Sequence, residues 1–187
     1  MLNNYYDKFI FTGQIKFKDS NFFLIDIPIL ILPAELLADL LFYSSHEQGK
    51  QIYSSVKKSV KAFLPALQAK PKYKGISLVN FVFDFFSSSG FGKLNLVNFD
   101  EEKKRAIILV SSSPFSSFFK NKSKKPIDHI LRGVIAGAFS YAFEKDFDCV
   151  ETKCVSMSSS RCEFIVNSNS EFDFSKKNTQ NQIDPVL

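Results

Sequence analysis

The segment from Pro126 to Phe143 restricts the fold more than any other part of the sequence. A proline is favoured at the first position of a helix, so we expect a helix to begin at Pro126. Gly133 and Gly137 form a stripe without side chains on this helix, which lets the backbone of a neighbouring element approach closely. The apolar residues recur every three or four positions, which is the spacing of one helix face: Ile127, Ile130, Leu131, Val134, Ile135, Ala138, Phe139, Ala142 and Phe143.

The remaining segments alternate between helical and strand-like patterns. Ser44 and Glu47 have the spacing of a capping box, in which each side chain accepts a hydrogen bond from the other residue's backbone N–H at a helix start. Helical spacing predicts helices over residues 34–42, 44–67 and 76–86. Short apolar runs bounded by turn residues predict strands over residues 8–17, 22–27, 93–99, 105–110, 147–155 and 161–166.

This order of elements predicts an α+β fold for a single domain over residues 1–187. The strand pairs at 93–110 and 147–166 could form one antiparallel sheet of about four strands, with several helices covering one face. Residues 168–187 are polar, and we expect them to be a frayed tail.

Composition narrows the classes of function. The formal charge is +5, but the lysines are scattered and the sequence has only three arginines, which argues against nucleic-acid binding. Prolines and acidic residues interrupt the most apolar stretch, 22–37, so we predict no transmembrane segment. Three cysteines and no leader sequence favour a cytoplasmic protein. The 22 phenylalanines indicate a thick core or an apolar cavity, or only a biased codon usage.

Glu151, Cys154 and Cys162 are candidate metal ligands, because carboxylates and thiolates both bind zinc. Glu151 and Cys154 would face opposite sides of an ideal strand, so a shared ion requires a bulge or a strand end near Thr152. A fourth ligand is available from Asp128 or His129 at the start of the glycine-containing helix. The alternative is that the cysteines are buried core residues.

A resemblance to a known family rests on the same segments. The stretch from His129 to Gly137, the sequence Glu151-Thr-Lys-Cys154 and the later Cys162-Glu-Phe resemble the vinyl-4-reductase domain. Residues 125–167 carry most of the likeness, and the stretch from Tyr43 to Gly49 resembles that family's Tyr-x-x-Gly helix. The fold family also includes the transport-particle (TRAPP) subunits of vesicle tethering.

The resemblance implies a dimeric domain that binds small apolar molecules, in some relatives with a structural zinc. Its zinc ligands fall by position on Glu151, Cys154 and Cys162, and on Asp128 where the family has a cysteine. Ser158 stands where the family has glycine.

We therefore expect a sensor or regulatory module for a small apolar ligand such as a hydrocarbon, acting as a homodimer. The Phe-rich helix at 76–86 is expected to face the glycine stripe, with Phe81, Phe85 and Phe139 as cavity walls. The alternative is a non-catalytic tethering subunit with a filled core. An enzyme is not expected, because the sequence has two histidines and lacks a phosphate-binding glycine loop.

Overall fold

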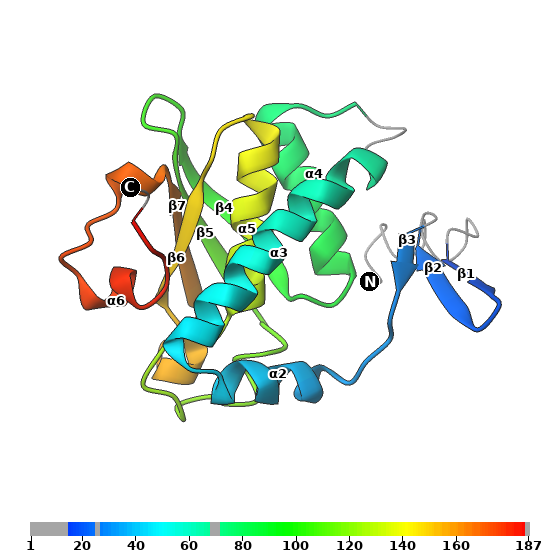
Figure 1. The fold of residues 1–187 in the computed structure, drawn as a ribbon, viewed down its shortest axis with the longest axis horizontal. Helices are drawn as coiled ribbons and strands as arrows, with labels where there is room; N and C mark the ends of the chain where they lie inside the picture. The colour runs from blue at the N-terminus through cyan, green and yellow to red at the C-terminus, as the bar shows by residue number, and fades with distance from the viewer. Residues whose placement is uncertain (1–14, 25–26, 68–71, 186–187) are drawn as a thin grey trace.

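The computed structural model describes residues 15–24, 27–67 and 72–185. Figure 1 shows one sheet with helices packed against it, and a small separate sheet near the N-terminus. The N-terminal sheet contains β1 (Ile15–Lys18), β2 (Asn21–Leu24) and β3 (Ile27–Ile29). The larger sheet contains β4 (Lys93–Asp100), β5 (Arg105–Ser111), β6 (Asp148–Lys153) and β7 (Cys162–Asn167). The helices are α2 (Ala34–Tyr43), α3 (His46–Leu67), α4 (Gly75–Ser88), α5 (His129–Ala142), α6 (Lys177–Gln180) and the 3-10 turns η1 (Val155–Met157) and η2 (Asn169–Glu171).

The larger sheet has the strand order β4-β5-β7-β6, and all of its neighbouring strands are antiparallel. The two predicted strand pairs therefore join through β5 and β7, as the sequence suggested. Alternate residues of β5 are buried, which directs Ala106, Ile108 and Val110 toward the core. The predicted α+β class with a four-stranded antiparallel sheet is confirmed.

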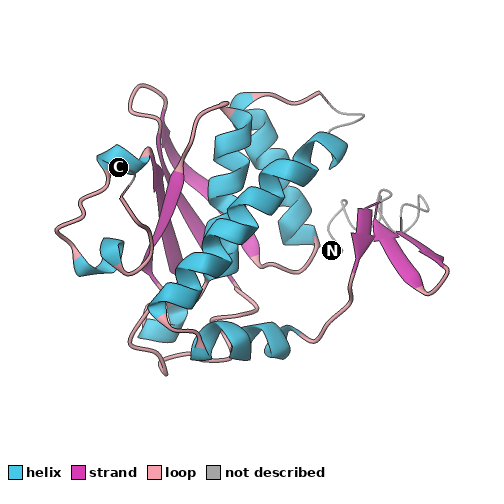
Figure 2. Cartoon of the chain, in the orientation of Figure 1, coloured by secondary structure: helices cyan, strands magenta, loops and turns pink. Residues whose placement is uncertain are grey.

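Helices α4 and α5 cover one face of this sheet, and α3 packs on α5 (Figures 1 and 2). The glycine stripe of α5 is the point of closest approach. A Cβ atom on Gly133 would lie 2.6 Å from the Val56 Cβ, and one on Gly137 would lie 2.8 Å from the Val60 Cβ. The glycines thus bring α5 into contact with α3. The expectation that they face the 76–86 helix across a cavity was wrong.

Two predicted helix starts are displaced. Helix α5 begins at His129 rather than Pro126, and Asp128 occupies its N-cap position. The capping box of α3 is formed one residue later than predicted, between Ser45 and Gln48. Ser44 instead donates its hydroxyl to the Leu41 carbonyl at the end of α2.

The predictions for the two ends of the chain had different outcomes. The predicted strand at 8–17 lies partly outside the described residues, and its described part begins at Ile15. The C-terminal segment was expected to be frayed, but it packs along β6. Gln182 and Ile183 are buried there, at 2% and 3% exposure. None of the described helices is long and apolar enough to span a bilayer.

Candidate functional site

Four ionisable side chains meet at the start of α5 and the end of β6. One potential ligand atom from each of Asp128, Glu151, Cys154 and Cys162 lies within 4.8 Å of the other three, and all four residues are buried. Asp128 precedes α5, Glu151 lies near the end of β6, Cys154 directly follows β6, and Cys162 begins β7. The cluster could hold a metal ion, because carboxylate oxygens and thiolates are metal ligands.

A register shift in β6 allows this arrangement. The pairing with β7 slips between Glu151 and Lys153, so Thr152 is the extra residue of a β-bulge. A bulge reorients the side chains that follow it. The strand ends at Lys153, and Cys154 turns inward to complete the cluster.

Hydrogen bonds hold the cluster in place. Asp128 accepts one from the Ser113 hydroxyl at 2.9 Å and one from the Cys162 thiol at 3.1 Å. Its backbone N–H donates to Glu151 Oε2 at 3.2 Å, while Glu151 Oε1 has no hydrogen-bond partner among the described residues. A buried carboxylate oxygen without a partner is costly. A cation bound among the four side chains would satisfy it.

Burial, neighbouring charges and the contact between the two thiols shift the pKa values of the four groups. Burial, and then the nearby Cys154 thiolate, raise the pKa of Asp128 to about 7. Burial followed by the charges of Asp128 and Cys154 raises the pKa of Glu151 well above its ordinary value. Contact with the Cys162 thiol lowers the pKa of Cys154 to about 5, and the same contact raises the pKa of Cys162. The cluster thus retains protons that a divalent cation would replace.

The two candidates for the fourth ligand separate in the structure. Asp128 joins the cluster, whereas His129 turns toward α3. A Cβ on Gly49 would lie 2.6 Å from His129 Nε2, so the glycine leaves room for the imidazole. His129 Nδ1 lies 3.3 Å from the Arg132 guanidinium, and burial followed by the Arg132 charge lowers the pKa of His129 to about 3. The third cysteine, Cys149, is fully buried and lies outside the cluster.

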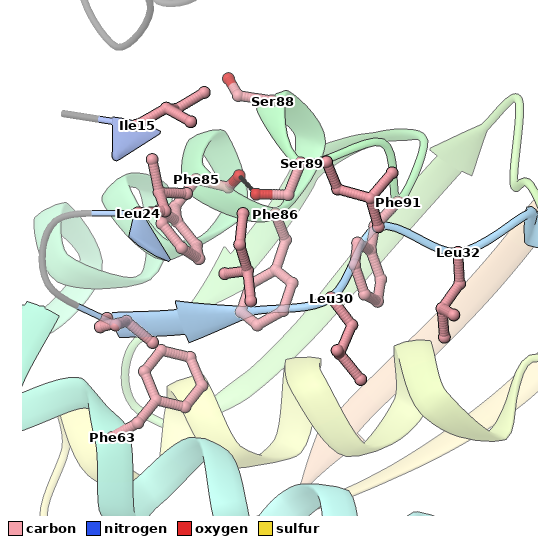
Figure 3. Close-up of a pocket in the computed structure, with 13 residues that line it drawn as sticks. Ile15, Leu24, Leu30, Leu32, Phe63, Phe85, Phe86, Ser88, Ser89 and Phe91 are labelled. Carbon is pink, nitrogen blue, oxygen red and sulfur yellow. Dashed lines mark hydrogen bonds between the residues drawn. The ribbon is translucent and has the colours of Figure 1, made fainter. Parts of the chain in front are cut away.

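An apolar groove lies between the N-terminal sheet and the helices (Figure 3). Its volume is about 570 Å³. Aliphatic side chains from the N-terminal segment meet phenylalanines of α3, α4 and the turn after α4. The lining residues are Ile15, Leu24, Ile27, Ile29, Leu30, Ile31, Leu32, Phe63, Phe85, Phe86, Ser88, Ser89 and Phe91.

The three predicted cavity residues have different places. Phe85 lines the groove. Phe81 packs on Tyr73 with ring centres 5.0 Å apart. Phe139 is fully buried among other phenylalanine rings, including Phe83 at 6.3 Å. The sequence reasoning missed the run of apolar residues at 29–32, which lies between two prolines and supplies one wall of the groove.

Part of the chain matches the model of a known protein family. Residues 115–168 match the family model of the vinyl-4-reductase domain, the family inferred from the sequence. This match covers α5, the bulged end of β6 and the whole of β7, so all four cluster residues lie within it. The resemblance to this family is therefore confirmed. No curated protein sequence matches the chain.

Solved structures share the fold. The phenol-responsive sensory domain of the transcription activator PoxR, solved with phenol, superposes with a TM-score of 0.74 at 10% identity, over 92% of this chain and 94% of that one. Trafficking protein particle complex subunit 3 from Naegleria fowleri, covalently bound to palmitic acid, gives 0.54 at 16% identity, over 72% and 93%. A vinyl-4-reductase family protein from Methanocaldococcus jannaschii gives 0.50 at 22% identity, over 74% and 83%.

Proposed function

We propose that this protein is a non-catalytic sensor or regulatory module that binds a small apolar molecule in the groove beside the N-terminal sheet. The groove itself carries the proposal, because its walls are almost entirely aliphatic and aromatic and its size suits a small organic ligand. The likeness to a phenol-responsive sensory domain supports this choice.

Ligand binding can be tested with phenol and with palmitate as probes, measured by calorimetry and native mass spectrometry. Leu30 lines the groove and is 84% exposed, so Leu30→Gln should leave the fold intact while weakening binding at least tenfold. Val97 is also exposed, at 58%, but lies on β4 away from the groove. Val97→Gln is therefore the matched control. Binding that both variants retain would refute the assignment of the groove.

We further propose that Asp128, Glu151, Cys154 and Cys162 hold a structural zinc ion. Two thiolates and two carboxylates are a donor set that zinc accepts, and the unpartnered Glu151 Oε1 supports a bound cation. Zinc there would tie α5 to the final hairpin. Its role would be structural, because all four candidate ligands are buried in the protein.

A tethering subunit is the second candidate function. The likeness to the trafficking subunit and a strip of exposed apolar residues on α2, Leu36, Leu40 and Tyr43, favour it. The same strip supports self-association, and we propose a homodimer. Light scattering at micromolar concentration tests this, and a monomer would count against both functions.

The three free buried cysteines support a reducing compartment, and we propose the cytoplasm.

A further inference from the structure

A second pocket, separate from the apolar groove, lies where the start of α3, the loop before α5 and the C-terminal segment meet. Its volume is about 620 Å³. The described residues that line it include no carboxylate. They are Phe42, His46, Lys122, Ser123, Lys124, Lys125, Pro126, Met157, Lys177, Asn178 and Asn181.

Folding brings four lysines to this pocket from two segments that are about fifty residues apart in the sequence. Among the described residues, Lys122, Lys124 and Lys177 have no carboxylate within ion-pair distance, whereas Lys176, next to Lys177, pairs with Asp173. Like charges gathered in one concave site repel each other and raise the local positive potential. An anionic ligand would relieve this repulsion.

Contacts within the protein also hold residues of the pocket in place. Lys125 is partly buried, and its ammonium donates to the Ser44 carbonyl at the end of α2. Asn178 is fixed by a 3.1 Å hydrogen bond from its amide to the Glu151 carbonyl. The positive end of the α3 dipole lies at His46, which is the first residue of a 22-residue helix. Burial and then the charges of Lys125, Lys177 and Lys50 lower the pKa of His46, which is consistent with a positive potential there.

We propose that this basic pocket binds the phosphate group of a phosphorylated small molecule. Lysine ammonium groups are common phosphate ligands, and the N-terminus of α3 also favours a negatively charged ligand. The pocket is larger than a phosphate ion, and Phe42 and Met157 add apolar surface to its wall. These features indicate a phosphate ester that carries an organic group. The pocket shares no lining residue with the groove or with the metal cluster.

The test uses the full chain and inorganic phosphate as the probe, followed by amide chemical shifts in NMR spectra at constant ionic strength. Saturable shifts should concentrate on His46, Ser123 and Asn178. The pocket variant carries Lys122→Gln, Lys124→Gln and Lys177→Gln, three exposed lysines whose loss should not disturb the fold. The matched control carries Lys58→Gln, Lys93→Gln and Lys103→Gln, which are exposed, lie elsewhere and remove the same charge.

The pocket variant should bind phosphate at least tenfold more weakly than the unmodified chain, and the control should change less than twofold. Equal weakening in both variants would refute a site, because it would reflect only the overall charge. A second arm measures co-sedimentation with phosphatidylcholine vesicles that contain or lack phosphatidylserine. Binding to the anionic vesicles alone, lost in the pocket variant, would assign the phosphate group to a lipid headgroup. The absence of binding in both arms would overturn the proposal.

Discussion

The Gln182 side chain brackets the peptide backbone of Glu151 with two hydrogen bonds. Its Oε1 accepts from the Glu151 N–H at 2.9 Å, and its Nε2 donates to the Glu151 carbonyl at 2.9 Å. The C-terminal segment thereby completes the outer edge of β6, as a further strand would. It also fixes the backbone of a residue in the candidate metal cluster.

Gln182→Ala should therefore destabilise the protein by about 1 to 3 kcal/mol, because it leaves the buried Glu151 N–H without a partner, while the Glu151 carbonyl keeps only its hydrogen bond from the Asn178 amide. Denaturation in urea would measure the loss. Gln180 is exposed two residues earlier, so Gln180→Ala is the control and should cost at most about 0.5 kcal/mol. Similar small effects of both changes would mean that the C-terminal segment does not support β6.

Removal of one cluster thiol should release the metal. If zinc is bound as proposed, Cys154→Ser should lower the zinc content measured by elemental analysis, and should lower the melting temperature because metal-binding energy in such a site is folding energy. Cys149 offers a control, since it is a buried thiol outside the cluster. Cys149→Ala should keep its zinc despite a loss of packing. A melting temperature that a chelator leaves unchanged would show that the thiols serve only as core residues.

The contact between α3 and α5 predicts a large effect for a small change. Gly137→Ala places a methyl group 2.8 Å from the Val60 Cβ and 2.9 Å from the Lys57 carbonyl oxygen, and the backbone atom cannot move without shifting α3. We expect a loss of about 1 to 3 kcal/mol from overpacking. In an open helix the same change would stabilise by about 1 kcal/mol. The sign of the change in unfolding free energy therefore decides whether the glycine serves close packing.

The periodicity of apolar residues was sufficient to predict the helices and strands that bury one face. The helix around Gly133 and the four strands of the main sheet carry clear apolar repeats, so their existence and antiparallel pairing could be predicted. The cluster of Glu151, Cys154 and Cys162 could be proposed from ligand chemistry. The condition for it, a bulge at Thr152, is a local departure from ideal geometry that residue types do not specify.

The features that the sequence could not supply depend on contacts between distant segments. Nothing local to Gly137 shows whether α3 or α4 lies against it. Gln182 looks like one polar residue in a polar tail, and its role appears only when β6 lies beside it. The groove was missed for the same reason, since Leu30 and Phe86 meet only through the placement of the N-terminal sheet.

Asp148 should make stability depend on pH. Burial raises its pKa, but the Lys57 charge and hydrogen bonds from Lys57, Tyr53 and Asn169 outweigh this effect and leave the pKa below its ordinary value. Such a carboxylate stabilises the fold above its unfolded pKa of about 3.9, and this contribution is lost as the pH falls through the folded pKa. The difference in unfolding free energy between the unmodified chain and Asp148→Asn should thus be largest near neutral pH and shrink in acid. A difference that stays constant with pH would contradict this.

Ser158 follows η1 with a left-handed backbone, at φ 71°. A residue with a Cβ pays about 1 kcal/mol in this conformation, and glycine does not. Ser158 is exposed, so removal of its side chain costs little packing. Ser158→Gly should therefore stabilise the protein by about 0.5 kcal/mol once the greater freedom of glycine in the unfolded chain is counted. Ser159→Gly, at a neighbour outside the left-handed region, should instead destabilise by a similar amount. Urea denaturation would measure the change in unfolding free energy for both variants. Changes of opposite sign would establish that the turn between the candidate ligands Cys154 and Cys162 is strained at Ser158. Changes of the same sign would exclude this strain.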